Sequence, residues 1–78
     1  MLILVLNSGS SSIKFKLFNM TAQEILAEGT VDRIGINNSF IEYENNKGID
    51  TEIKTEIPDH ITGIELVRDT LLDEEIGV

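Results

Sequence analysis

The chain opens with LILVLNSGSSSIKFKLF (residues 2–18), in which two apolar runs flank a short segment of small polar residues. The first run is apolar at every position. This is typical of a strand covered on both faces, as in the middle of an α/β sheet. The second run alternates apolar with basic side chains, which is typical of a strand with one face in the core. Residues 1–20 are therefore predicted to form a β-hairpin whose turn spans residues 7–12.

Working outward from this hairpin, alternating apolar residues predict three more strands at about residues 24–34, 40–44 and 49–57. The last two flank the sequence NNKG (residues 45–48), whose residues tolerate positive φ and favour a tight turn. A helix is then expected after Pro58, with Asp59 as its N-cap. Its apolar positions, which fall in one stripe, are Ile61, Ile64, Val67, Leu71 and Leu72.

The order of these elements indicates an incomplete domain. A helix that follows strands of a sheet normally leads into a parallel strand through a right-handed crossover, and no such strand follows within the 78 residues. A chain of this length also buries only about 60% of the surface that its unfolded form exposes. Without cysteine and with a single histidine, it has no disulfide, zinc-thiolate or histidine-rich site to compensate. We therefore expect residues 1–78 to be one segment of a larger protein.

Charge is distributed unevenly along the chain. Residues 1–20 carry two lysines and no acid, a balance of +2, whereas residues 21–78 carry 14 acids and four basic residues, a balance of −10. The acidic part excludes a nucleic-acid or anionic-membrane surface, because phosphate contacts require Lys or Arg. No signal peptide or membrane-spanning run is visible, so a cytoplasmic protein is expected. Only the first 20 residues are suited to a phosphate ligand.

The turn at residues 7–12 has the parts of a phosphate site. Small residues between two strands can direct several backbone N–H groups at one anion, and Gly9 lets the backbone approach a ligand closely. Lys14 adds a cation, while Asn7 offers a neutral oxygen ligand for Mg²⁺ or one of its waters. The hydroxyl donors are Ser10, Ser11 and Ser12. Neither a Walker A loop nor a dinucleotide fingerprint is present, and a plain turn whose serines bond their own backbone remains an alternative.

The stretch LVLNSGSSSIKF (residues 4–15) closely resembles the amino-terminal motif of the acetate kinases, members of the acetate/sugar kinase, heat-shock-70 and actin superfamily. The resemblance continues through EGTVDRIG (residues 28–35) and weakly through Asp59, His60 and the following helix. It implies an α/β fold with a ribonuclease-H-like (actin-like ATPase) lobe. In this chain that lobe is truncated to a mainly antiparallel sheet of about five strands with one helix. Residues 1–78 would form the amino-terminal segment of the first of two lobes.

The resemblance also implies a reaction: the reversible transfer of phosphate from ATP to acetate, with Mg²⁺, to give acetyl phosphate and ADP. Asn7 matches the Mg²⁺-associated asparagine of the family, and Lys14 matches a lysine assigned to ATP binding. Ser10 and Ser12, with Gly9, match the loop that faces the ATP phosphates. The catalytic acid and the substrate-binding arginines of the family fall beyond residue 78. No catalytic residue is therefore expected in this segment, which alone should be inactive.

Two alternatives remain beside an acetate kinase. One is a propionate kinase of the same family, since the acyl pocket lies outside the segment; the other is a stand-alone binding or interaction module. As a kinase, the full-length protein is expected to be a homodimer that binds ATP or ADP and a short-chain carboxylate. The segment itself is expected to pack against the remainder of its own polypeptide. His60 is interpreted as a surface or capping residue, Lys16 as a solvated lysine, and the acids of the later hairpin as ordinary surface charge.

Overall fold

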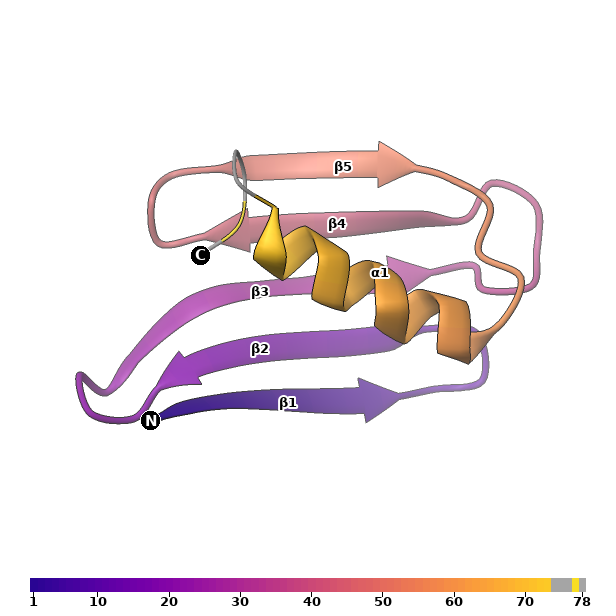
Figure 1. Cartoon of the computed structure of the whole chain (residues 1–78). Coiled ribbons are helices and arrows are strands. Elements are labelled where there is room, and N and C mark those ends of the chain that lie inside the picture. Colours follow the sequence, from indigo (N-terminus) through magenta and orange to yellow (C-terminus); the bar gives the residue numbers. More distant parts are fainter. Residues whose placement is uncertain (74–76, 78) are drawn as a thin grey trace.

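The computed structural model describes residues 1–73 and residue 77. Five strands precede one helix, and the strands lie side by side in the order of the sequence to form a single antiparallel sheet (Figure 1). The elements are β1 (Leu2–Ser8), β2 (Ile13–Asn19), β3 (Glu24–Asp32), β4 (Phe40–Asn45), β5 (Asp50–Lys54) and α1 (His60–Leu72). The predicted five-stranded antiparallel sheet with one helix is confirmed.

The first hairpin forms as predicted, but its turn is shorter. β1 pairs with β2 from Leu2 opposite Asn19 to Ser8 opposite Ile13. Asn7 is therefore part of the strand, and only Gly9 to Ser12 connect the two strands. This places the side chain of Asn7 on the pleated surface of the sheet, where its direction is fixed by the strand.

Two predicted strands end earlier than the sequence pattern suggested. β3 stops at Asp32 because Arg33 has a φ of 55°, which turns the chain away from the sheet. β5 stops at Lys54 because the segment after it is bonded to Ser39, just ahead of β4. The Ser39 hydroxyl donates to the Thr55 carbonyl at 2.8 Å and accepts from the Ile57 N–H at 2.9 Å. The Thr55 N–H also donates to the Ser39 carbonyl at 3.2 Å, so the backbone and side chain of Ser39 together take the place of the partner strand at this corner.

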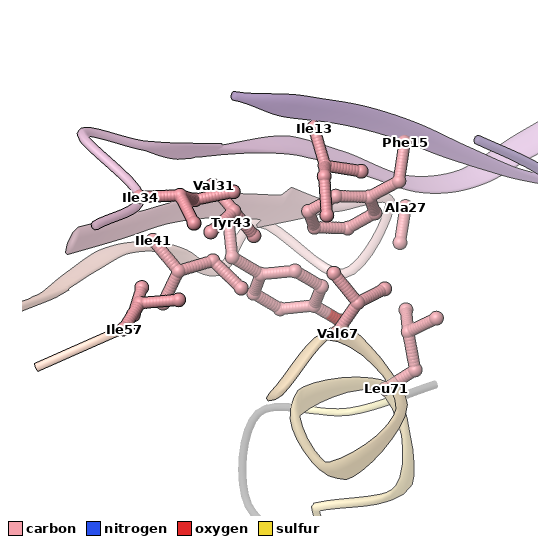
Figure 2. Packing of buried hydrophobic residues seen from close by; sticks show 10 residues of the cluster. All are labelled: Ile13, Phe15, Ala27, Val31, Ile34, Ile41, Tyr43, Ile57, Val67 and Leu71. Atoms are coloured by element: carbon pink, nitrogen blue, oxygen red, sulfur yellow. The ribbon is translucent and has the colours of Figure 1, made fainter. Parts of the chain in front are cut away.

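The core lies between the sheet and α1 (Figure 2). In the middle of the sheet, Gly29 of β3 stands between Phe15 of β2 and Tyr43 of β4, which are its cross-strand partners. The two rings stack with centroids 6.5 Å apart and an interplanar angle of 16°. Because Gly29 has no side chain, the aromatic rings fill the space above it. The buried apolar residues are Ile13, Phe15, Ala27, Val31, Ile34, Ile41, Tyr43, Ile57, Val67 and Leu71.

Helix α1 begins where predicted and crosses one face of the sheet (Figure 1). Asp59 is its N-cap, and the Asp59 carboxylate accepts from the Thr62 N–H at 2.8 Å. The predicted apolar stripe is only partly correct: Val67 and Leu71 are buried, but Ile61, Ile64 and Leu72 are exposed. The helix instead approaches the sheet through Gly63, where a Cβ would lie 3.2 Å from Cδ1 of Ile13. A residue without a side chain permits this close approach.

Strand β1 differs most from its prediction. Its run is apolar throughout, yet the strand lies at the edge of the sheet and pairs only with β2 among the described residues. Both of its faces are open: Leu2 is 62% exposed and Val5 is 48% exposed. The prediction that β1 is central is therefore wrong for this chain, in which no described segment covers it. The structure also contains no described helix with the length and apolar character needed to cross a membrane.

Candidate functional site

Asn7 and Lys14 meet on the face of the sheet that α1 does not cover. They are direct cross-strand partners in the register of β1 and β2. Successive side chains of a strand point to opposite faces. Since Ile13 and Phe15 are in the core, Lys14 must point to the open face, and Asn7 opposite it does the same. Both residues line a hollow of about 600 Å³ on this face.

The two lysines of β2 have different surroundings, although they share a face. Lys16 lies 3.7 Å from a carboxylate oxygen of Glu28, its cross-strand partner on β3. Lys14 stands opposite Thr30 of β3, which is uncharged, and forms no ion pair with a described residue. The charge of Lys14 is therefore available to an external anion, whereas that of Lys16 is partly neutralised.

The turn beside this pair is held by three hydrogen bonds. The Gly9 N–H donates to the Ser12 carbonyl at 2.7 Å, and the Ile34 N–H donates to the Ser11 carbonyl at 2.9 Å. The third comes from His60, whose Nε2 lies 2.7 Å from the Gly9 carbonyl oxygen. The carbonyl can only accept, so Nε2 carries the proton.

These bonds use the carbonyl groups of the turn and leave most of its donors unused. In the described part of the chain, no group accepts from the backbone N–H of Ser10, Ser11 or Ser12, nor from their hydroxyls. Ser10 is exposed, while Ser11 and Ser12 are half-buried. Several N–H and O–H donors next to a lysine form an arrangement that suits an anion.

The far end of the hollow has the opposite charge. Glu28, Glu44 and Asp50 follow one another across β3, β4 and β5 on the open face. A hydrogen bond between the carboxyl groups of Glu28 and Glu44, followed by their mutual repulsion, raises the pKa of Glu44. No cluster of three metal-ligating His, Cys, Asp or Glu residues exists within residues 1–73 and 77. The negative charge of these acids disfavours an anion at this end of the hollow, whereas Lys14 favours one at the end beside the turn.

Of the residues predicted from the sequence, Asn7 and Lys14 are brought together, and Gly9, Ser10 and Ser12 lie on the adjoining turn. The residue that sequence reasoning missed is His60. It stands directly after the N-cap, a position where a capping or surface residue is the ordinary interpretation. Its partner, Gly9, lies 51 residues earlier in the chain. No local pattern could have revealed the contact, since it depends on where α1 begins relative to the hairpin.

Comparisons with known proteins show the family to which the chain belongs. The family model described as "Acetokinase family" matches residues 2–77. The acetate kinase of Halothermothrix orenii is 60% identical over 78 residues, covering all of this chain and 20% of that protein. That of Phocaeicola vulgatus is 47% identical over 77 residues, covering 99% of this chain and 19% of that protein. The chain belongs to the acetokinase family.

Solved structures give the same result. The crystal structure of Porphyromonas gingivalis acetate kinase superimposes with a TM-score of 0.91 at 34% identity, covering 97% of this chain and 19% of that one. A propionate kinase from Francisella tularensis subsp. tularensis SCHU S4 gives a TM-score of 0.82 at 28% identity, covering 95% and 19%. The chain thus spans about a fifth of the length of these relatives, and the aligned part is their amino-terminal part.

Proposed function

We propose that the chain is the amino-terminal segment of the first lobe of an acetate kinase, which transfers phosphate reversibly between ATP and acetate. The observation that carries this proposal is the pairing of Asn7 with Lys14 beside a turn with unused donors, in a member of the acetokinase family. Phosphoryl transfer depends mainly on positioning the phosphates and neutralising their charge. The segment supplies groups for both tasks.

In this proposal Lys14 binds the phosphates of ATP. Its ammonium group is the unpaired cation at the turn end of the hollow, as judged over the described residues. Ser10 and Ser12 donate hydrogen bonds to phosphate oxygens from their backbone N–H groups and hydroxyls. Gly9 contributes by its lack of a side chain, since the backbone of the turn can then approach the ligand.

The residues present also suit a Mg²⁺ ion, in a limited way. Asn7 provides an amide oxygen on the open face, and its side chain makes no hydrogen bond with residues 1–73 or 77. Mg²⁺ prefers oxygen ligands and usually keeps several waters, with few protein ligands. Asn7 would therefore hold the ion directly or through one of its waters. When bound, Mg²⁺ neutralises the charge of the phosphates.

The remaining parts of the enzyme are assigned to the rest of the polypeptide. A catalytic acid and a carboxylate pocket are not expected within this segment, which is about a fifth of the length of its relatives. The two open faces of β1 support this view: a strand that is apolar at Leu2, Val5 and the positions between them is suited to burial. We propose that the remainder of the same chain covers β1. We also propose that the full-length enzyme is a homodimer and that it is cytoplasmic.

The second candidate is a propionate kinase, which the structural likeness to the Francisella tularensis protein favours. The two candidates share the turn and differ in the pocket for the acyl chain, which is proposed to lie outside the segment. A stand-alone binding module, the third candidate, would have the turn without the reaction.

The test is an assay of the full-length protein for ADP formation from Mg·ATP, with acetate and propionate as separate acceptors. Acetate is expected to give the higher kcat/KM. A preference for propionate would select the second candidate. If ADP formation depended on neither carboxylate, the kinase would be rejected in favour of the binding module.

A further inference from the structure

The contact between His60 and Gly9 joins two distant parts of the fold at the turn. In an ordinary closed β-turn, the carbonyl of the first residue accepts from the N–H of the fourth. In the turn Gly9–Ser12 the bond runs the other way, from the Gly9 N–H to the Ser12 carbonyl at 2.7 Å. The Gly9 carbonyl accepts from His60 Nε2 instead, also at 2.7 Å. The Ser12 N–H is thereby left without an acceptor within residues 1–73 and 77.

The position of His60 is itself well fixed. His60 is the first residue of α1 and follows the N-cap Asp59. The Asp59 carboxylate accepts a hydrogen bond from the Thr62 N–H, and this bond is the main reason that the pKa of Asp59 is lowered. Three residues after His60, Gly63 lets the helix approach Ile13 at the start of β2 closely, since a Cβ there would lie 3.2 Å from Cδ1 of Ile13. The imidazole therefore projects from a capped and packed helix end.

A second route connects the same segments on the other side of the turn. The Ile34 N–H donates to the Ser11 carbonyl at 2.9 Å. The next residue, Gly35, donates from its N–H to the Ile57 carbonyl at 2.8 Å, just ahead of α1. The turn, the connection between β3 and β4, and the start of α1 are thus linked in a closed ring of hydrogen bonds, and His60 supplies the bond that completes it. Figure 1 shows the start of α1 at the end of the sheet where β1 and β2 are joined.

We propose that His60 is a positioning residue that holds the Gly9 carbonyl and so keeps the turn Gly9–Ser12 open, with its N–H groups directed at a phosphate. The proposal rests on the proposed function of the turn. His60 contacts the turn through the Gly9 carbonyl, an acceptor that would repel a phosphate. His60 therefore takes no part in the transfer itself. Removing its bond frees the carbonyl to close the turn in the ordinary way.

The test compares three variants of the full-length protein: His60→Ala, His60→Gln and, as a matched control, Ile61→Ala. Ile61 is the next residue of α1 and is exposed. The amide nitrogen of glutamine lies about as far from the backbone as Nε2 and can donate the same bond. Two quantities are measured: amide exchange of Gly9 and Ile34, the two N–H groups that hold the turn, and the KM values for Mg·ATP and acetate.

In His60→Ala, both amides are expected to exchange about fivefold faster, the effect of losing one hydrogen bond. The KM for Mg·ATP should rise about fivefold, with little change in the KM for acetate. His60→Gln should restore both quantities to nearly the original values, and Ile61→Ala should leave them unchanged. Unaltered exchange in His60→Ala would overturn the proposal, as would a glutamine variant no better than alanine or an equal rise in both KM values.

The exchange measurement separates this proposal from the proposed function. If the unaltered protein fails to phosphorylate acetate but His60→Ala still loosens Gly9 and Ile34, the positioning role stands and the kinase assignment fails. If the protein is an active kinase and the exchange of these amides is unaffected in His60→Ala, the positioning role fails and the kinase assignment stands.

Discussion

The two faces of the sheet differ in what their residues do, although the same strands form both. In β2, Phe15 points to the face covered by α1 and stacks on Tyr43, while its neighbour Lys14 points to the open face beside Asn7. The covered face carries the apolar core, and no buried side-chain nitrogen or oxygen of the described residues lacks a hydrogen-bond partner. The open face carries charge without partners at one end and repelling acids at the other. We therefore expect changes on the covered face to alter stability, and changes on the open face to alter binding.

The largest effect is expected on the covered face, at Gly29. A Cβ added there would collide with the Glu42 carbonyl oxygen and would lie 2.7 Å from Cζ of Phe15. Backbone cannot move aside easily, so Gly29→Ala should lower the free energy of unfolding by about 3 kcal/mol or more. Urea unfolding of the full-length protein measures this change in the free energy of unfolding.

The control for Gly29→Ala is Gly48→Ala. A Cβ at residue 48 meets open space, and only the φ of +87° is unfavourable. This substitution should cost about 1 kcal/mol. Equal losses in both variants would refute the packing account.

The next effect is expected on the open face, at Lys14. Lys14→Ala should lower kcat/KM for Mg·ATP about 100-fold or more, the size found when one charge-stabilising donor is removed. Lys16→Ala is the matched control because it lies on the same face of the same strand but pairs with Glu28. It should change kcat/KM little. Both variants should unfold within about 0.5 kcal/mol of the unaltered protein, as is usual for surface positions. Comparable losses of activity in the two variants would contradict the special place given to Lys14.

A smaller effect is expected from the hydroxyls of the turn. Ser10→Ala and Ser12→Ala should each raise the KM for Mg·ATP about three- to tenfold, as expected for one hydrogen bond. Ser11→Ala should have less effect, because the proposal assigns phosphate contacts to the other two serines and Ser11 is tied back to Ile34 through its carbonyl. Steady-state kinetics with saturating acetate measure all three. If Ser11→Ala were the most impaired variant, the orientation assigned to the turn would be wrong.

The smallest effect is expected at the acidic end of the open face. Glu28 raises the pKa of Glu44, so between pH 4.5 and the raised pKa the folded state binds more protons than the unfolded state. Stability from this source is present at acidic pH and is lost as the pH rises from 4.5 through the raised pKa. Glu44→Gln should therefore increase the Tm slightly at pH 7 and flatten its dependence on pH in this range. Glu65→Gln, on α1, serves as the control; a lower Tm at pH 7 in Glu44→Gln would contradict the stated repulsion.

Much of the contrast between the faces could be predicted from the sequence. Alternation in β2 identified the core residue Phe15 and the outward Lys14, and the small residues between the strands identified the turn. Asp59 was recognisable as an N-cap because capping depends on residues within one helical turn. Each of these predictions is local, and local patterns follow directly from strand and helix geometry.

The features that the sequence did not predict depend on distant contacts. The apolar stripe of α1 included Ile61 and Ile64, whereas the helix approaches the sheet through Gly63, a choice made by the shape of the sheet below it. The apolar run of β1 predicted a central strand, but a strand is covered only where other segments are present to pack on it. The bond from His60 to Gly9 spans 51 residues and follows from the whole fold.

The central claim is that the turn between β1 and β2 binds the phosphates of ATP. A crystal structure of the full-length protein with Mg²⁺ and a non-hydrolysable ATP analogue tests it most directly. We predict phosphate oxygens at hydrogen-bonding distance, about 2.7–3.2 Å, from donors of Ser10, Ser12 and Lys14, with Mg²⁺ or one of its waters on the Asn7 side chain. Phosphates bound elsewhere, with the turn in contact only with water, would contradict the account.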